Sequence, residues 1–75
     1  MIIITGAYGF IGSNLVRTLI EQYNQEVLAV DIVKRPYLDD LHFDFVDADE
    51  FYSNLKKYCL DATVIFHEGA ISATT

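Results

Sequence analysis

The stretch that decides the fold is TGAYGFIG, residues 5–12. It follows an uncharged run of mostly β-branched residues, 1–5, and precedes residues 12–23, in which apolar side chains recur at helical spacing. A glycine-rich turn between a buried strand and a helix lets the backbone approach a pyrophosphate, and the helix offers it unpaired N–H groups. We therefore predict that Gly6 allows a tight turn, Gly9 a close approach, and Gly12 close packing of the helix on the strand.

A carboxylate further along the chain supports dinucleotide binding. Asp31 ends the next predicted strand, residues 26–31, about 20 residues after the glycine turn, where such folds place an acid on the adenosine ribose hydroxyls. The alternative is that Asp31 only caps a loop. Lys34 and Arg35 follow and either accommodate the 2′-phosphate of NADP, which Asp31 would repel, or belong to a solvated loop. The sequence leaves NAD and NADP open.

The rest of the chain continues the alternation of strands and helices. We expect a surface loop over residues 34–40, a strand over residues 42–47, a second helix over residues 49–60 and a strand over residues 62–67. The order predicts an α/β fold, a Rossmann-type parallel sheet with covering helices, of which this chain supplies the amino-terminal portion of about four strands and two helices.

Several apolar side chains are predicted to face the core. In the strand over residues 42–47 these are Phe43, Phe45 and Val46, and the apolar stripe of the second helix comprises Phe51, Leu55, Tyr58 and Cys59. Asp49 and Glu50 would lie at the amino end of that helix, where negative charge is favourable.

Length and composition exclude several classes of protein. The chain has 75 residues, of which 52% are hydrophobic, which favours one small globular domain over disorder. A net charge of −6 with only five Lys and Arg residues argues against nucleic-acid binding. No apolar run is long enough to cross a bilayer, no secretory signal is recognisable, and the single cysteine, Cys59, forms no internal disulfide. We expect a cytoplasmic protein without a membrane or nucleic-acid partner.

Two motifs make the chain resemble the extended short-chain dehydrogenase/reductases that act on nucleotide sugars, the NAD-dependent epimerases and dehydratases. Residues 5–12 match the TGxxGFIG opening of that family, and residues 65–75, IFHEGAISATT, are similar to the loop after the fourth strand in the branch that epimerises ADP-heptoses at carbon six. The resemblance covers essentially the whole chain and is weakest over residues 32–60.

The resemblance implies roles for individual residues. Phe10 and Ile11 would contribute backbone groups to the pyrophosphate, Asp31 and Ile32 would flank the adenosine ribose, and Asp47 and Ala48 would contact adenine. The middle and nicotinamide side of the cofactor would be lined by Glu68, Gly69, Ala70, Ile71 and Ser72. Two departures from the family pattern are Ile32, in place of an amide side chain that often reaches the 2′-phosphate, and the bulky Tyr8 in the turn.

The resemblance also implies an activity. NAD or NADP would take a hydride from carbon six of a nucleotide sugar and return it to the other face, converting ADP-D-glycero-D-manno-heptose to its L-glycero epimer for lipopolysaccharide core synthesis, in a homo-oligomeric enzyme. The alternatives are another nucleotide-sugar epimerase or dehydratase, and a truncated nucleotide-binding polypeptide without catalysis.

Catalysis in this family needs a Tyr and a Lys one helical turn apart, and the resemblance implies that this pair lies beyond Thr75. Tyr52 and Lys56 have that spacing, but we interpret them as structural residues outside the carboxyl edge of the sheet. His67 is expected to be a hydrogen-bonded strand end, Cys59 a buried thiol, and no metal site is expected. Because half a sheet leaves an unpaired apolar edge, we expect the 75 residues alone to be unstable and to bind NAD(P) weakly.

Overall fold

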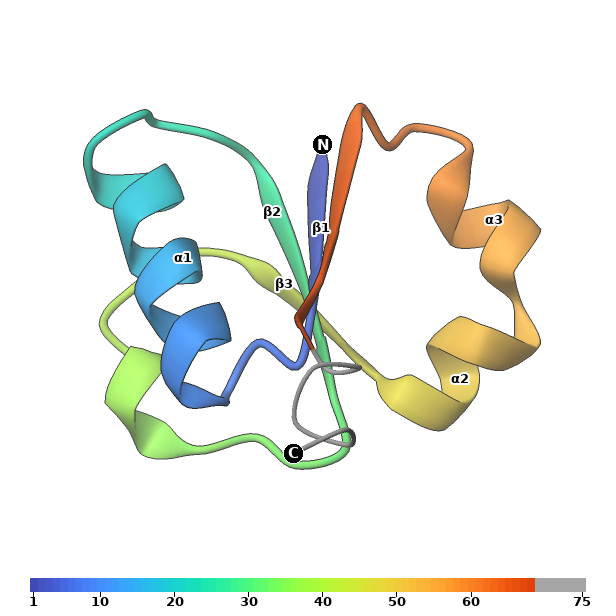
Figure 1. The fold of residues 1–75 in the computed structure, drawn as a ribbon, viewed down its shortest axis with the longest axis horizontal. Coiled ribbons are helices and arrows are strands. Elements are labelled where there is room, and N and C mark those ends of the chain that lie inside the picture. Colours follow the sequence, from blue (N-terminus) through green and yellow to red (C-terminus); the bar gives the residue numbers. More distant parts are fainter. Residues whose placement is uncertain (69–75) are drawn as a thin grey trace.

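Four parallel strands form one sheet in the computed structural model, which describes residues 1–68 (Figure 1). The elements, in chain order, are β1 (Ile2–Thr5), α1 (Phe10–Glu21), β2 (Val27–Asp31), the 3₁₀ helix η1 (Pro36–Leu38), β3 (Asp44–Asp47), α2 (Ala48–Ser53), α3 (Leu55–Cys59) and β4 (Val64–His67). The strand order is β3-β2-β1-β4, and every neighbouring pair is parallel. The predicted α/β architecture is confirmed.

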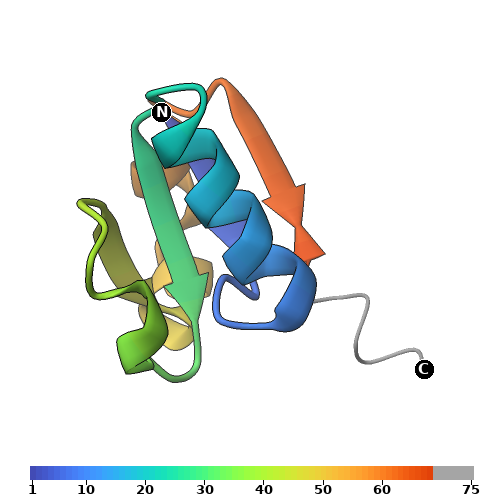
Figure 2. The ribbon, with the colours of Figure 1, turned by 90° about the vertical axis from the view of Figure 1, so that its left-hand side faces the viewer.

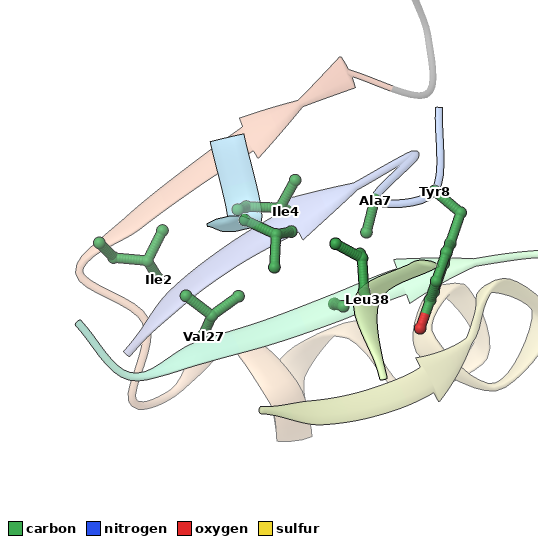
Figure 3. Close-up of a cluster of buried hydrophobic side chains, with 8 residues drawn as sticks. Ile2, Ile4, Ala7, Tyr8, Val27 and Leu38 are labelled. Atoms are coloured by element: carbon green, nitrogen blue, oxygen red, sulfur yellow. The ribbon is translucent and has the colours of Figure 1, made fainter. Parts of the chain in front are cut away.

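The helices cover both faces of the sheet, which explains why β1 and β2 are apolar without alternation. α1 and η1 lie on one face, and α2 and α3 lie on the other (Figures 1 and 2). Successive strand residues point to opposite faces, so Ile2 and Ile4 join the core cluster on the α1 side while Ile3 joins the cluster that holds Phe51 of α2. Figure 3 shows the first of these clusters.

Two of the chain connections lie on opposite faces of the sheet and diverge between β1 and β4. The chain passes from β1 to β2 through α1 on one face, and from β3 to β4 through α2 and α3 on the other. β1 and β4 are neighbours, with Thr5 paired in register with His67 at their carboxyl ends. Ligands of open α/β sheets bind outside the carboxyl ends of the strands where the connections diverge.

The prediction of one continuous helix over residues 49–60 is wrong, because the structure has two shorter helices there, α2 and α3. Asn54 has φ −135° and ψ 42°, which ends α2 at Ser53 and starts α3 at Leu55. The side-chain amide of Asn54 donates a hydrogen bond to the backbone carbonyl oxygen of Glu50 at 3.1 Å. Such local side-chain bonds compete with the backbone hydrogen bonds of a helix. Leu55, predicted on the apolar stripe, is consequently 46% exposed.

The predicted surface loop over residues 34–40 is also corrected. The segment contains η1, whose first residue is Pro36. This turn directs the side chain of Leu38 into the core, and the residue is only 1% exposed. Leu38 belongs to the cluster under α1 (Figure 3). The segment is therefore partly a core element and not only a solvated loop.

The edges of the described sheet differ in character. β3 is shorter than predicted, but Phe43 and Phe45 pack against the α1-side cluster and Val46 against the other, as expected. β4 lies at the opposite edge, where Val64 and Ile65 are 44% and 46% exposed. The apolar edge foreseen from the sequence is thus present within residues 1–68. No helix in this part of the chain has the length and apolarity to cross a membrane.

A bidentate ion pair fixes the segment after β2 to α1. The guanidinium of Arg17 donates two bonds of 2.9 Å to the carboxylate of Asp40 and a third, of 3.1 Å, to the carbonyl oxygen of Tyr37. The Tyr37 hydroxyl in turn donates to the carbonyl oxygen of Tyr8 in the glycine turn. Residues 37–40 are therefore tied both to α1 and to the glycine turn. The hydrogen bonds from Arg17 also lower the pKa of Asp40.

We predict that Asp40→Asn lowers the midpoint of thermal unfolding at pH 7. Folding lowers the pKa of Asp40, so the pair stabilises the fold above the ordinary pKa of an aspartate and loses this contribution as the pH falls through the lowered value. The difference between the two proteins should therefore close on acidification. Asp39→Asn, in the same segment but without an ion pair to a described residue, is the control. Equal midpoints at pH 7, or a difference that persists in acid, contradict this account.

Candidate functional site

A cleft of about 630 Å³ lies at the carboxyl ends of β1, β2 and β4. Its walls come from the glycine turn, the first residues of α1, the segment after β2, the start of α2 and residues 67 and 68. The volume falls in the range of small-molecule sites, roughly 300–1,000 Å³. The cleft is therefore large enough for a ligand, and it lies at the point where the chain connections diverge.

The glycine turn is built by close backbone contacts. Gly6 has φ 65°, a left-handed conformation that favours glycine, and its carbonyl oxygen accepts the N–H of Gly9 at 3.0 Å. A Cβ on Gly12 would lie 2.1 Å from the Gly6 oxygen, whereas one on Gly9 would lie 3.3 Å from it. The predicted turn at Gly6 is present, and the close contact of Gly12 is made with the turn itself, at Gly6 and Ala7.

The amino end of α1 is open toward the cleft. Its N-cap, Gly9, has an extended backbone and no side chain to cap the helix, and the first turn contains no acidic residue. Phe10, Ile11 and Gly12 of that turn line the cleft. Because the first N–H groups of a helix have no intrahelical acceptor and carry the positive end of its dipole, this terminus favours an anion.

Asp31 ties the end of β2 to the glycine turn. Its Oδ2 accepts the backbone N–H of Tyr8 at 2.8 Å, and its Oδ1 accepts that of Ile32 at 2.6 Å. The loop-capping role considered from the sequence is thus observed. It does not exclude a ligand, because each carboxylate oxygen can accept a further hydrogen bond and Asp31 lines the cleft.

The bulk of Tyr8 does not obstruct the site. Its ring turns into the α1-side core (Figure 3), and the residue is 5% exposed. The ring makes edge contacts with Tyr37 and Phe45 at centroid distances of 5.7 and 5.9 Å. Burial raises the pKa of its phenol. Tyr8 therefore anchors the turn to the core and is also one of the residues that line the cleft.

The polar side chains of Thr5, His67 and Tyr52 lie close together where β1 and β4 end. The Thr5 hydroxyl and His67 Nδ1 are 2.9 Å apart, so the predicted hydrogen-bonded strand end is confirmed for His67. The Tyr52 hydroxyl lies 3.4 Å from the same nitrogen and Tyr52 lines the cleft, so its predicted position outside the carboxyl edge is wrong. α2 begins directly after β3 and keeps Tyr52 at this edge, whereas Lys56 follows the break at Asn54 and does not line the cleft.

The structure gathers most of the residues expected to bind cofactor. The predicted residues that line the cleft are Gly6, Gly9, Phe10, Ile11, Gly12, Asp31, Ile32, Ala48 and Glu68. Asp47 is not among the lining residues. Its carboxylate caps α2 by accepting the N–H of Asp49 at 3.0 Å. Gly69, Ala70, Ile71 and Ser72 lie outside the described residues.

Two further side chains, those of Arg35 and Tyr52, belong to residues that line the cleft. Of the cations after β2, Arg35 lines the cleft, while Lys34 places its Nζ 5.7 Å from the centre of the Phe45 ring. Tyr52 is absent from the sequence prediction of the site. Its place in the first helix after a strand, at the carboxyl edge of the sheet, is the signal that could have indicated it.

Comparisons with known proteins agree with this geometry. Residues 2–75 match the NAD dependent epimerase/dehydratase family. The chain is 42% identical, over 96% of its length, to an ADP-L-glycero-D-manno-heptose-6-epimerase of Thiobacillus denitrificans, and the match spans 24% of that relative. No solved structure matches the chain.

We predict that Gly12→Ala destabilises the fold more than Gly9→Ala. A Cβ 2.1 Å from the Gly6 oxygen forces the helix away from the turn, whereas a contact of 3.3 Å requires a shift of a few tenths of an ångström. Overpacking of this kind costs about 1–3 kcal/mol. Chemical denaturation monitored by circular dichroism measures the difference, and a Gly12→Ala protein as stable as Gly9→Ala refutes the contact as a constraint.

Proposed function

This chain belongs to the NAD dependent epimerase/dehydratase family, and on that premise we propose that its cleft binds the adenosine and pyrophosphate portion of NAD or NADP. The cofactor of this family is NAD(P). One observation carries the proposal: the uncapped amino end of α1 and the carboxylate of Asp31 line the same cleft, joined by a hydrogen bond through Tyr8.

The residues present fit a dinucleotide. The first-turn N–H groups of α1, which Gly9 has no side chain to cap, would hold the pyrophosphate. The Asp31 oxygens would accept the ribose hydroxyls, and the 80% exposed Ile32 offers an apolar surface at the rim. When bound, the nicotinamide supplies a site that accepts and returns a hydride.

The choice between NAD and NADP depends on opposing charges. Asp31 favours free ribose hydroxyls, since a 2′-phosphate beside its carboxylate is repelled. Arg35 would offset this repulsion, because it lines the cleft, whereas Lys34 does not. Both cofactors therefore remain part of the proposal.

We further propose that the protein to which this sequence belongs is a nucleotide-sugar epimerase that inverts carbon six of ADP-D-glycero-D-manno-heptose, for lipopolysaccharide core synthesis. The identity to a heptose-6-epimerase supports this assignment, and the chain spans about a quarter of that relative's length, 24%. Another epimerase or dehydratase of the family, or a binding polypeptide without catalysis, is the alternative. The cytoplasmic location and homo-oligomeric state expected from the sequence stay predictions.

Binding is tested by titrating the ¹⁵N-labelled chain with NAD to millimolar concentrations and following the amide resonances of Gly6, Gly9 and Gly12. We expect these signals to move and Asp31→Ala to weaken binding about tenfold or more, because hydrogen bonds to a charged group are lost. Asp44→Ala, which removes an exposed carboxylate outside the cleft, is the matched control. Unmoved glycine signals, or an Asp31→Ala protein of unchanged affinity, refute the proposed site.

The reaction is tested on the protein to which this sequence belongs, by supplying it with NAD or NADP and with ADP-D-glycero-D-manno-heptose labelled with deuterium at carbon six. We expect the L-glycero product with the deuterium retained, because the hydride removed from carbon six is returned to it. Conversion of a different nucleotide sugar would favour another epimerase or dehydratase. Cofactor binding without any conversion would favour the non-catalytic alternative.

A further inference from the structure

We propose that Tyr52 contacts the dinucleotide from the α2 side of the cleft, where its hydroxyl forms a hydrogen bond with the ligand. His67 is then a positioning residue, which holds the Tyr52 phenol in place for this contact. The inference rests on the proposed dinucleotide site. Tyr52 lies on α2, on the face of the sheet opposite α1, and belongs neither to the glycine turn nor to the carboxylate at the end of β2.

The packing of α2 presents Tyr52 to the cleft. Phe51 is 2% exposed in the core, whereas the adjacent Tyr52 is 47% exposed and lines the cleft. The Tyr52 ring makes edge contacts with Phe51 at 5.1 Å and with His67 at 6.2 Å between centroids. Tyr52 is thus held between a core residue of its own helix and the last residue of β4.

The hydrogen bonding leaves the phenol capacity for a ligand. His67 Nδ1 either donates one proton or accepts through one lone pair, and its shorter contact, 2.9 Å, is with Thr5. The contact of 3.4 Å from the Tyr52 hydroxyl is therefore the weaker one. Tyr58 differs, because its hydroxyl is engaged with the Glu50 carboxylate at 2.8 Å and it does not line the cleft.

The charge of the cleft creates a need for such a donor. Among the described lining residues, Arg35 is the only Lys or Arg, while Asp31 and Glu68 carry negative charge. A dinucleotide carries two phosphate charges. Because the described lining residues include one cation, Arg35, most hydrogen bonds to these phosphates must come from neutral donors. The N–H groups of α1 supply these from one face of the sheet, and the Tyr52 hydroxyl is a neutral donor on the other.

The test compares Tyr52→Phe with Tyr58→Phe, each of which removes one hydroxyl. Affinity for NAD is measured by titration of the ¹⁵N-labelled chain. We expect Tyr52→Phe to weaken binding about threefold to tenfold, the loss of one hydrogen bond, and Tyr58→Phe to leave it unchanged. In a His67→Ala background the Tyr52→Phe effect should shrink, because the phenol is no longer held in place.

The outcomes separate this inference from the proposed function. If the unsubstituted chain binds NAD and Tyr52→Phe binds equally well, the inference is overturned while the site stands. If the unsubstituted chain shows no binding of NAD, both are overturned. Should Tyr52→Phe fail to fold, a 3-fluorotyrosine at position 52 replaces it, and a fluorine resonance that does not move on addition of NAD refutes the contact.

Discussion

The contact between Gly12 and the turn at Gly6 is the constraint on which the rest of the structure depends. A Cβ at Gly12 would lie 2.1 Å from the Gly6 oxygen, so α1 can start directly against the turn only with glycine there. This approach places the open helix end at the carboxyl edge of β1 and brings Phe10 and Ile11 to the cleft. Fold and site therefore share one steric requirement.

Asp31 couples this turn to the neighbouring strand. Its carboxylate accepts the backbone N–H groups of Tyr8 and Ile32, so the group proposed to recognise ribose also ties the glycine turn to the end of β2. Loss of Asp31 should consequently disturb both halves of the site. On the opposite side, Thr5, His67 and Tyr52 form a second polar group where β1 and β4 end.

The sequence predicts what depends on local rules and misses what depends on tertiary packing. The left-handed Gly6, the strands around it and Asp31 follow from turn chemistry and from the spacing of a known fold. The burial of Leu38 depends on the path of the chain between elements, which hydrophobic spacing does not encode. The exposure of Leu55 follows from the break at Asn54, which interrupts the predicted helix. Asp47 is different, because the bond by which it caps α2, from the N–H of Asp49, is local, and Asp47 is absent from the cleft lining.

We propose that a dinucleotide lies in this cleft with its adenosine ribose beside Asp31. Intermolecular nuclear Overhauser effects between NAD and the isotope-labelled chain test it most directly. We expect effects from the adenosine ribose protons to the methyl groups of Ile32, which is 80% exposed, and to the amide protons of the first turn of α1. Effects confined to the separate groove lined by Met1, Leu28 and Lys57, or none at all, would contradict it.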